Sequence, residues 1–190
     1  MKKIDANNKG YLLIGGIVLT VLAVVFSLVY DLQISSALSF FGGSAVASFM
    51  VLVGKINSVM LTLLGLALVF FINKKEFRKF VVGIFTTIVS VVLLKMLIER
   101  PRPYLAGIEV PLNIIKDSYT TWNWSFPSSH SAIPFFVIPF IPKKWRLYWI
   151  IFAVIMAFSR IYLGLHYLSD VIFGASLGLI IAYAFKKIKA

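Results

Sequence analysis

Long apolar runs, separated by short polar stretches, make up most of this chain. The first run covers residues 10–30, with no charge between Lys9 and Asp31. It is long enough for a helix across the roughly 30 Å hydrocarbon core of a bilayer, which needs about 20 apolar residues. Five further runs are expected to form helices, at residues 56–73, 80–98, 131–141, 147–162 and 168–185. The pattern therefore predicts an all-α bundle of six transmembrane helices.

Two segments depart from a simple series of spans. The predicted helix at residues 131–141 is short and contains Pro134 and Pro139. Residues 32–54 carry no charge, but they include Gln33, five serines and three glycines. We interpret this segment as a loop with an interfacial or re-entrant piece. The first apolar run lacks a small-residue cleavage site, so we expect a retained helix rather than a cleaved signal peptide.

The composition supports a membrane location. Hydrophobic residues make up 60% of the 190 residues and charged residues only 14%, whereas soluble domains average roughly 45–50% and about 25%. The chain has no cysteine, which excludes disulfides and cysteine-ligated zinc or iron–sulfur sites. There is no internal repeat or low-complexity linker, so the length fits a single integral membrane domain spanning residues 1–190.

The basic residues are distributed unevenly between the two sides of the membrane. If the connections alternate, one side receives thirteen Lys and Arg with two acids, and the other receives six with five acids. Basic residues accumulate in cytoplasmic loops, so both termini are expected on the cytoplasmic side of the plasma membrane. The net charge of +12 suits anionic lipid head groups. It does not indicate nucleic-acid binding, because the charges form short loop clusters without a nucleic-acid motif.

Six ionisable residues are expected to collect at the opposite, outward face, although they span 76 positions of sequence. They are Lys95, Arg102, His130, Arg160, His166 and Asp170. Ionisable groups in or near the bilayer are costly and are therefore functional candidates. Taken singly, each has an ordinary explanation as a snorkelling cation, an interfacial histidine or a helix cap. All of these explanations would have to hold at one face together, so we favour a functional site.

The chemistry of this cluster suits transfer of a phosphoryl group. His166 and Asp170 are four residues apart, so their side chains meet on one face of a helix. The carboxylate fixes the imidazole tautomer and leaves the other ring nitrogen free to attack. His130 has no such partner nearby in sequence and is available as a proton donor. The three cations match the charge of a phosphate, and Ser128 and Ser129 offer backbone N–H groups to an anion at a helix N-terminus.

Three spaced motifs give the chain a resemblance to a known family. They are Lys95 followed by Arg102-Pro103, then Pro127-Ser128-Ser129-His130, then Ser159-Arg160 followed by His166 and Asp170. This arrangement resembles the three-part signature of the type 2 phosphatidic acid phosphatase superfamily. The family usually has glycine where this chain has Ser129. A Cβ there matters only if the turn needs a positive φ or a very close approach to the phosphate.

The resemblance implies a role for each matching residue. His166 would be the nucleophile, Asp170 would orient it, and His130 would protonate the leaving oxygen and then activate water. The phosphate oxygens would be held by Lys95, Arg102, Arg160, Ser128 and the backbone N–H of Ser129. The family needs no metal ion or other cofactor, and one carboxylate among the six ionisable residues is too few for a hard divalent cation. Glu99 and Arg100 lie inside the first motif but outside its signature, and we expect them to be structural.

An outward site among apolar helices favours a lipid phosphate as substrate, because a lipid can enter sideways while its head group stays at the water boundary. By analogy with compact bacterial members of the family, a polyprenyl diphosphate such as undecaprenyl diphosphate is the first candidate. Phosphatidylglycerophosphate, phosphatidate and lipid A 1-phosphate are the alternatives. Two other classes remain as alternatives: a transporter, which would more typically show repeated halves, and a non-enzymatic binding protein that kept the motifs.

Overall fold

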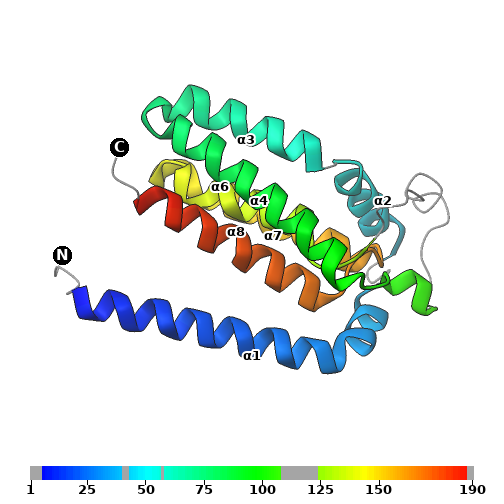
Figure 1. Cartoon of the computed structure of the whole chain (residues 1–190). Coiled ribbons are helices and arrows are strands. Elements are labelled where there is room, and N and C mark those ends of the chain that lie inside the picture. The colour runs from blue at the N-terminus through cyan, green and yellow to red at the C-terminus, as the bar shows by residue number, and fades with distance from the viewer. Residues whose placement is uncertain (1–5, 40–42, 57, 108–123, 188–190) are drawn as a thin grey trace.

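The computed structural model describes residues 6–39, 43–56, 58–107 and 124–187 (Figure 1). Its α-helices are α1 (Ala6–Leu38), α2 (Gly43–Gly54), α3 (Ser58–Ile72), α4 (Phe77–Ile98), α6 (Ser129–Val137), α7 (Lys143–Tyr162) and α8 (Leu168–Lys187). Three short 3₁₀ helices accompany them, η1 (Lys74–Glu76), η2 (Pro103–Ala106) and η3 (Ile138–Phe140). The described residues contain no strand, so the predicted all-α class is confirmed.

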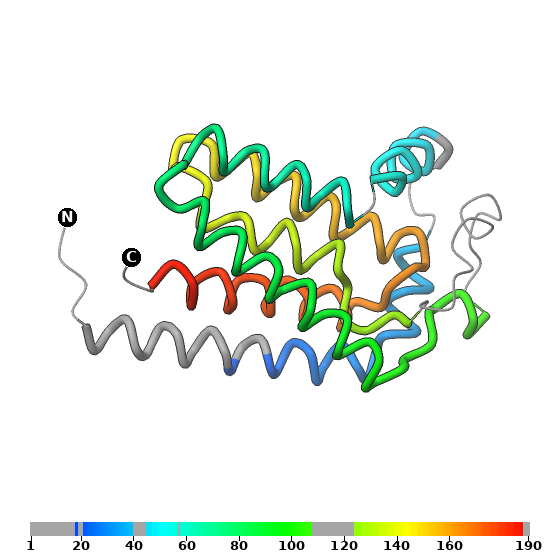
Figure 2. Tube along the Cα trace, turned by 45° about the horizontal axis from the view of Figure 1, so that its top comes forward, coloured from blue at the N-terminus to red at the C-terminus, as the bar shows by residue number. Residues whose placement is uncertain are grey.

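The long helices lie roughly alongside one another and surround the short helix α6 (Figures 1 and 2). α6 contacts α3, α4, α7 and α8, and α1 packs against α8. The start of α1, the η1 turn and the end of α8 lie at one end of the bundle (Figure 1). α2, η2 and the α7–α8 connection lie at the other end. Lys74 and Lys75 therefore share one end with Lys186 and Lys187, as the charge pattern predicts.

Helix length and composition indicate a multi-pass membrane protein. Four segments of the described chain are long and apolar enough to cross a bilayer, namely Val21–Leu38, Lys74–Ala106, Lys143–Tyr162 and Leu168–Lys187. The number rises to five if Ala45–Gly54 and Ser58–Ile72 form one broken span. All six predicted helices are present, but Ser129–Phe140 is shorter than a crossing. Large apolar side chains such as Phe71 and Leu97 are exposed on the outside of the bundle, as expected for contact with lipid.

The interpretation of residues 32–54 as a loop is wrong in part. α1 continues past Asp31 to Leu38, and residues 43–54 form α2. A charge in an apolar helix is costly, which is why the sequence suggested a break at Asp31. In the structure Asp31 is only 3% exposed and its carboxylate pairs with Arg100 at 2.7 Å, so the helix continues. α2 meets α3 at a bend of 72°, which is the geometry of a broken span or a re-entrant loop.

Two glycines of α8 allow α6 to approach very closely. A Cβ on Gly174 would lie 2.5 Å from the carbonyl oxygen of Ser128, and a Cβ on Gly178 would lie 2.1 Å from that of Ala132. Spacing of small residues by four positions is typical of closely packed membrane helices. The start of α6 is therefore placed directly beside the start of α8, where Asp170 lies.

At the end of α6 and η3, side chains donate hydrogen bonds to backbone carbonyls. Pro139 has no N–H to continue the helical ladder, and the chain tightens into η3. Trp149 Nε1 donates to the carbonyl of Pro134 at 2.8 Å. Asn73 Nδ2 donates to the carbonyl of Phe140 at 3.1 Å. Because these carbonyls have partners, α6 and η3 can end inside the bundle.

Candidate active site

The residues predicted for the site all lie at the end of the bundle that holds the α7–α8 connection. Four helices supply five of them: Lys95 in the last turn of α4, Ser129 and His130 at the start of α6, Arg160 in the last turn of α7, and Asp170 in the first turn of α8. The other three, Arg102, Ser128 and His166, lie in the adjoining connections. Segments far apart in sequence are thus brought to one place.

His166 lies in a tight connection between α7 and α8. Gly164, with φ of +62°, allows the sharp turn that follows α7. The backbone N–H groups of Leu165 and His166 then both donate to the carbonyl of Arg160, at 3.0 and 3.1 Å. This turn fixes the backbone of His166. The residue is only 2% exposed.

The predicted contact between His166 and Asp170 is present, but not for the predicted reason. Nδ1 of His166 lies 3.5 Å from Oδ2 of Asp170. The pair does not share a helical face, because α8 begins only at Leu168. Instead the same Oδ2 accepts the backbone N–H of Tyr167 at 2.9 Å, as an acidic residue in a first turn does when it reaches back to cap its helix. The contact of 3.5 Å is longer than an ordinary hydrogen bond.

The other side of the imidazole faces a guanidinium group. Nη1 of Arg102 donates to the carbonyl of Leu165 at 2.7 Å and lies 3.4 Å from Nε2 of His166. Burial, and then the positive charges of Arg102, Lys95 and Arg160, hold the pKa of His166 well below its usual value. The imidazole is therefore neutral at physiological pH, the form in which a ring nitrogen can act as a nucleophile.

Lys95 ties α4 to the segment that leads into α6. Its Nζ donates to the carbonyls of Trp124 and Ser125, at 2.5 and 3.4 Å. The backbone N–H of Ser125 in turn donates to the carbonyl of Arg100 at 2.8 Å. These bonds hold the segment before Ser128 against the end of α4, so the ammonium group lies next to the start of α6.

Arg160 reaches from α7 to the junction between α2 and α3. Its Nη2 donates to the carbonyls of Gly54 and Ile56, both at 3.2 Å. Its Nε is buried and has no hydrogen-bond partner among the described residues. The guanidinium group is thus held through Nη2, while the buried N–H of Nε can donate to another acceptor.

The start of α6 presents small polar groups beside α8. The backbone N–H of Ser128 donates to the carbonyl of Asp170 at 3.1 Å, and its buried hydroxyl has no hydrogen-bond partner among the described residues. Ser129 Oγ lies 3.5 Å from Nδ1 of His130. Glu99 is the one non-glycine residue with positive φ in the described chain. Ser129, at the position where the family usually has glycine, is therefore not in a conformation that needs glycine.

His130 and His166 share the same electropositive surroundings. The charges of Arg160, Arg102 and Lys95 act on both imidazoles, and His166 also acts on His130. Such a set of fixed cations suits an anion with several oxygen atoms. The predicted cluster of two histidines, three cations and one carboxylate therefore exists in space.

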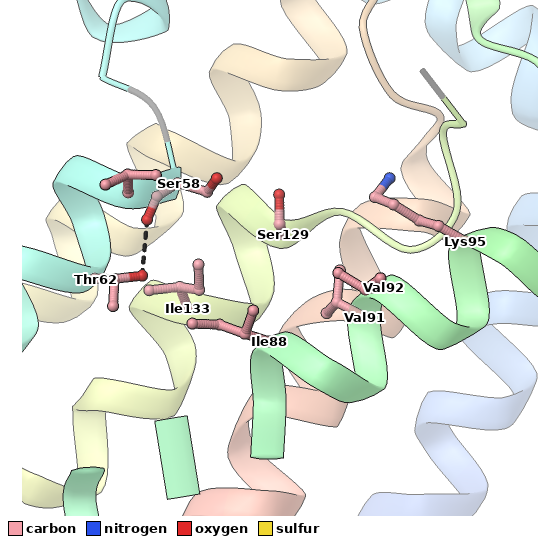
Figure 3. Close-up of a pocket in the computed structure, with 9 residues that line it drawn as sticks. Ser58, Thr62, Ile88, Val91, Val92, Lys95, Ser129 and Ile133 are labelled. Atoms are coloured by element: carbon pink, nitrogen blue, oxygen red, sulfur yellow. Dashed lines mark hydrogen bonds between the residues drawn. The ribbon is translucent and has the colours of Figure 1, made fainter. Parts of the chain in front are cut away.

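A cavity of about 260 Å³ adjoins this cluster between α3, α4 and the start of α6 (Figure 3). Lys95 and Ser129 form its polar end. The remaining lining residues are Ser58, Val59 and Thr62 of α3, Ile88, Val91 and Val92 of α4, and Ile133 of α6. Val59 and Val92 are also 64% and 41% exposed on the outside of the bundle. The cavity thus connects Lys95 with the apolar outer surface.

The sequence did not reveal one part of the site. Arg100, expected to be structural, donates from Nη1 to Oδ1 of Asp170 at 2.8 Å and from Nη2 to Oδ2 of Asp31 at 2.7 Å. Arg100 thereby joins Asp31 of α1 to Asp170 of α8, 139 residues further along the chain. No local sequence pattern connects these two helices. The available signal was the carboxylate itself, because an acid at the end of an apolar run needs a partner.

These features define a polytopic membrane protein with a cluster of histidines and cations, largely buried, at one end of its helices. The described residues contain no group of three or more His, Cys, Asp and Glu that could hold a metal ion. Comparison with known proteins identifies the family. Residues 76–190 match the PAP2 superfamily, and the chain belongs to this superfamily, as its three motifs indicated.

Individual relatives agree with this assignment. Phosphatidylglycerophosphatase B of Bacillus subtilis (strain 168) is 35% identical over an alignment of 108 residues, and the match covers 50% of this chain and 48% of that protein. The match thus spans about half the length of this curated relative.

Two solved structures share the fold. The crystal structure of a transmembrane PAP2 type phosphatidylglycerolphosphate phosphatase from Bacillus subtilis has a TM-score of 0.65 at 24% identity, covering 93% of this chain and 96% of that chain. Aquifex aeolicus LpxE has a TM-score of 0.64 at 20% identity, covering 83% and 95%.

Proposed function

We propose that this protein is a membrane lipid phosphatase that hydrolyses a phosphoric ester through a phosphohistidine on His166. The observation that carries the proposal is the placement of His166. Its imidazole is neutral and buried, with Asp170 on the Nδ1 side at 3.5 Å and Arg102 on the Nε2 side at 3.4 Å. A nucleophile with an orienting carboxylate on one side and a phosphate-binding cation on the other is suited to in-line attack.

The reaction has two steps. In the first, the lone pair on Nε2 of His166 attacks phosphorus and the bond from phosphorus to the leaving oxygen breaks. His130, protonated once the bound phosphate offsets the positive charges around it, donates its proton to that oxygen and becomes neutral. In the second, His130 takes a proton from water, the water oxygen attacks phosphorus, and the bond from phosphorus to Nε2 breaks. Inorganic phosphate is one product, and the other is the lipid without that phosphate group, which is an alcohol from a monoester and a lipid monophosphate from a diphosphate. Asp170 stabilises the positive imidazole ring of the intermediate.

The phosphate oxygens would be held by the surrounding donors. These are the side chains of Lys95, Arg102 and Arg160, the hydroxyl of Ser128 and the backbone N–H of Ser129. Three positive charges offset the charge that moves onto the non-bridging oxygens as the bonds change. With this set of donors the reaction needs no metal ion or other cofactor.

The cavity beside Lys95 and Ser129 suggests a lipid substrate. A phosphate bound at the polar end would leave its lipid tail among aliphatic side chains that reach the bilayer-facing surface. A sugar phosphate would place hydroxyl groups against Ile88, Val91 and Ile133, where the walls offer few hydrogen bonds. The cavity therefore favours a lipid head group that enters sideways from the bilayer.

Two lipid classes are proposed as substrates. Phosphatidylglycerophosphate comes first, because the relative that is 35% identical is named phosphatidylglycerophosphatase B. A polyprenyl diphosphate, favoured by analogy at the level of sequence, comes second. We further propose that residues 1–190 act as one membrane domain with cytoplasmic termini and a site facing outward. The support is that η1 and the end of α8, which carry Lys74, Lys75, Lys186 and Lys187, lie at the end of the bundle opposite the α7–α8 connection.

The test is phosphate release by purified protein in detergent. Phosphatidylglycerophosphate, undecaprenyl diphosphate, phosphatidate and lipid A would be offered side by side, with His166→Ala as the blank. Release from at least one lipid that His166→Ala abolishes is the expected result. Equal release by the blank, or none from any lipid, would overturn the proposal.

A further inference from the structure

The geometry points to Asp31 and Arg100 as positioning residues that aim and charge the His166–Asp170 pair, an inference that rests on the proposed function. Neither residue is one of the signature residues of the three motifs. Asp31 also lies outside the region, residues 76–190, that matches the superfamily. Helix α1 would thus contribute directly to the arrangement of the site.

Arg100 bridges two carboxylates with its planar fork. Nη1 lies 2.8 Å from Oδ1 of Asp170, and Nη2 lies 2.7 Å from Oδ2 of Asp31. A guanidinium group holds two such partners in fixed directions, which an ammonium group cannot do. With Oδ1 held by Arg100, the other oxygen of Asp170 is directed toward the Tyr167 N–H and His166 Nδ1. The bridge therefore sets which carboxylate oxygen faces the nucleophile.

Asp31 also holds the first turn of α8. Its Oδ1 accepts the backbone N–H of Ser169 at 3.1 Å, and its Oδ2 accepts the Ser169 hydroxyl. Nη1 of Arg100 lies 2.6 Å from the same hydroxyl. The guanidinium group is 4.0 Å from the centroid of the Tyr167 ring, close enough for a cation–π contact. Ser169 and Tyr167, which precede Asp170 in the chain, are thus both in contact with the Asp31–Arg100 pair.

The charges of this network explain why two carboxylates are needed. Asp31 is 3% exposed and Asp170 is fully buried, so their interactions with Arg100 are only weakly screened. If Asp31 were neutral, the charge of Arg100 would act on Asp170 alone and would weaken its support for the positive imidazole that forms on phosphoryl transfer. With Asp31 ionised, the three groups together keep one negative charge facing His166.

A simpler role for Asp31 would be to anchor α1. Ser27, Asp31 and Ser35 are all buried and four residues apart, so they form a polar stripe along one face of α1. If anchoring were the whole role, loss of the charge would lower stability without changing turnover by the folded protein. Ser27→Ala provides a matched control, because it alters the same buried stripe one turn away without removing a charge.

The test is a double-substitution cycle on kcat and KM in detergent, with melting temperature recorded for each variant. Phosphatidylglycerophosphate is the substrate, or undecaprenyl diphosphate if it is hydrolysed faster. We expect Asp31→Asn to lower kcat by about tenfold and Arg100→Gln by about a hundredfold, in the range of outer-shell partners, with KM little changed. Because Asp31 acts through Arg100, Asp31→Asn should have little further effect in the Arg100→Gln protein. Ser27→Ala should keep full kcat.

Each outcome decides between the two roles. Unchanged kcat in Asp31→Asn, or a loss that Ser27→Ala reproduces, would overturn the inference while leaving the proposed function in place. Independent, multiplicative losses for Asp31→Asn and Arg100→Gln would also overturn it. If the unsubstituted protein releases no phosphate from either lipid, the proposed function fails and the inference fails with it.

Discussion

Arg102 places a guanidinium nitrogen 3.4 Å from Nε2 of His166, on the side of the imidazole away from its contact with Asp170. The ring nitrogen that would attack phosphorus is therefore the one beside a cation that is proposed to bind the phosphate. The same cation disfavours protonation of the imidazole. In the proposed mechanism, Arg102 would thus both bind the substrate and keep the nucleophile unprotonated.

The titration of His166 should reflect this arrangement. The chain has only two histidines, so His130→Asn leaves a single imidazole signal for NMR. We expect no protonation of His166 near the ordinary pKa of 6.5, because burial and the charge of Arg102 favour the neutral form down to lower pH. Adding Arg102→Gln should raise the pKa of His166, since it removes a positive charge. A midpoint close to 6.5 in both proteins would contradict this account of the site.

The cavity next to Lys95 should control recognition of the lipid tail. Val92→Trp would fill the aliphatic part of a cavity of about 260 Å³ without touching the histidines. We expect KM for a long-chain lipid phosphate to rise by about tenfold, in line with loss of buried apolar contact. Hydrolysis of p-nitrophenyl phosphate, which has no lipid tail, should be unchanged. Leu93→Trp, at a neighbouring position that does not line the cavity, is the control, and an equal effect there would refute a tail site.

The fold was largely predictable because helices in a bilayer are set by local composition. The helix predicted at residues 80–98 is observed at Phe77–Ile98, and the helix predicted at residues 168–185 is observed at Leu168–Lys187. The prediction failed where stability depends on distant partners. Asp31 appeared to end an apolar run, but Arg100 and the N–H of Ser169 satisfy its carboxylate, and α1 continues for seven more residues.

The close contact of α6 with α8 should make Gly178 intolerant of any side chain. A Cβ there would lie 2.1 Å from a backbone oxygen of Ala132, so the helices would have to move apart. We expect Gly178→Ala to lower the free energy of unfolding by about 3 kcal/mol or more. Gly65→Ala is the comparison, because its Cβ would meet the side chains of Val137 and Phe80, which can adjust. Similar melting temperatures for both variants would show that the contact is not tight.

Activity should not depend on a metal ion. In the proposed mechanism the phosphate would be bound by Lys95, Arg102 and Arg160, and the nucleophile would be a histidine rather than a metal-bound water. We expect phosphate release to continue at an unchanged rate after dialysis against EDTA. Added Mg²⁺ should not increase it. A strict requirement for Mg²⁺, with loss in EDTA and recovery on addition of the ion, would contradict the proposed chemistry.

The candidate site was predictable to a different degree for each residue. His130, His166, Asp170 and the three cations were found because the alternation of helices places them at one face. The reason given for the His166–Asp170 contact was wrong, since α8 begins at Leu168 and the carboxylate reaches back as a helix cap. Arg100 was missed because its partners, Asp31 and Asp170, lie 69 and 70 residues away. Sequence spacing reveals contacts within a helix but not those between helices.

The most direct test of the central claim is to trap the covalent intermediate. Protein would be mixed with phosphatidylglycerophosphate labelled in its terminal phosphate, or with undecaprenyl diphosphate labelled in the same way, and quenched in alkali, where phosphohistidine survives. We predict a label that is stable in alkali and lost in acid, located on the peptide that contains His166. His166→Ala should show no label and should lower turnover by at least about 10³-fold, as expected for loss of a nucleophile. Label on another residue, or near-normal turnover by folded His166→Ala, would contradict the account.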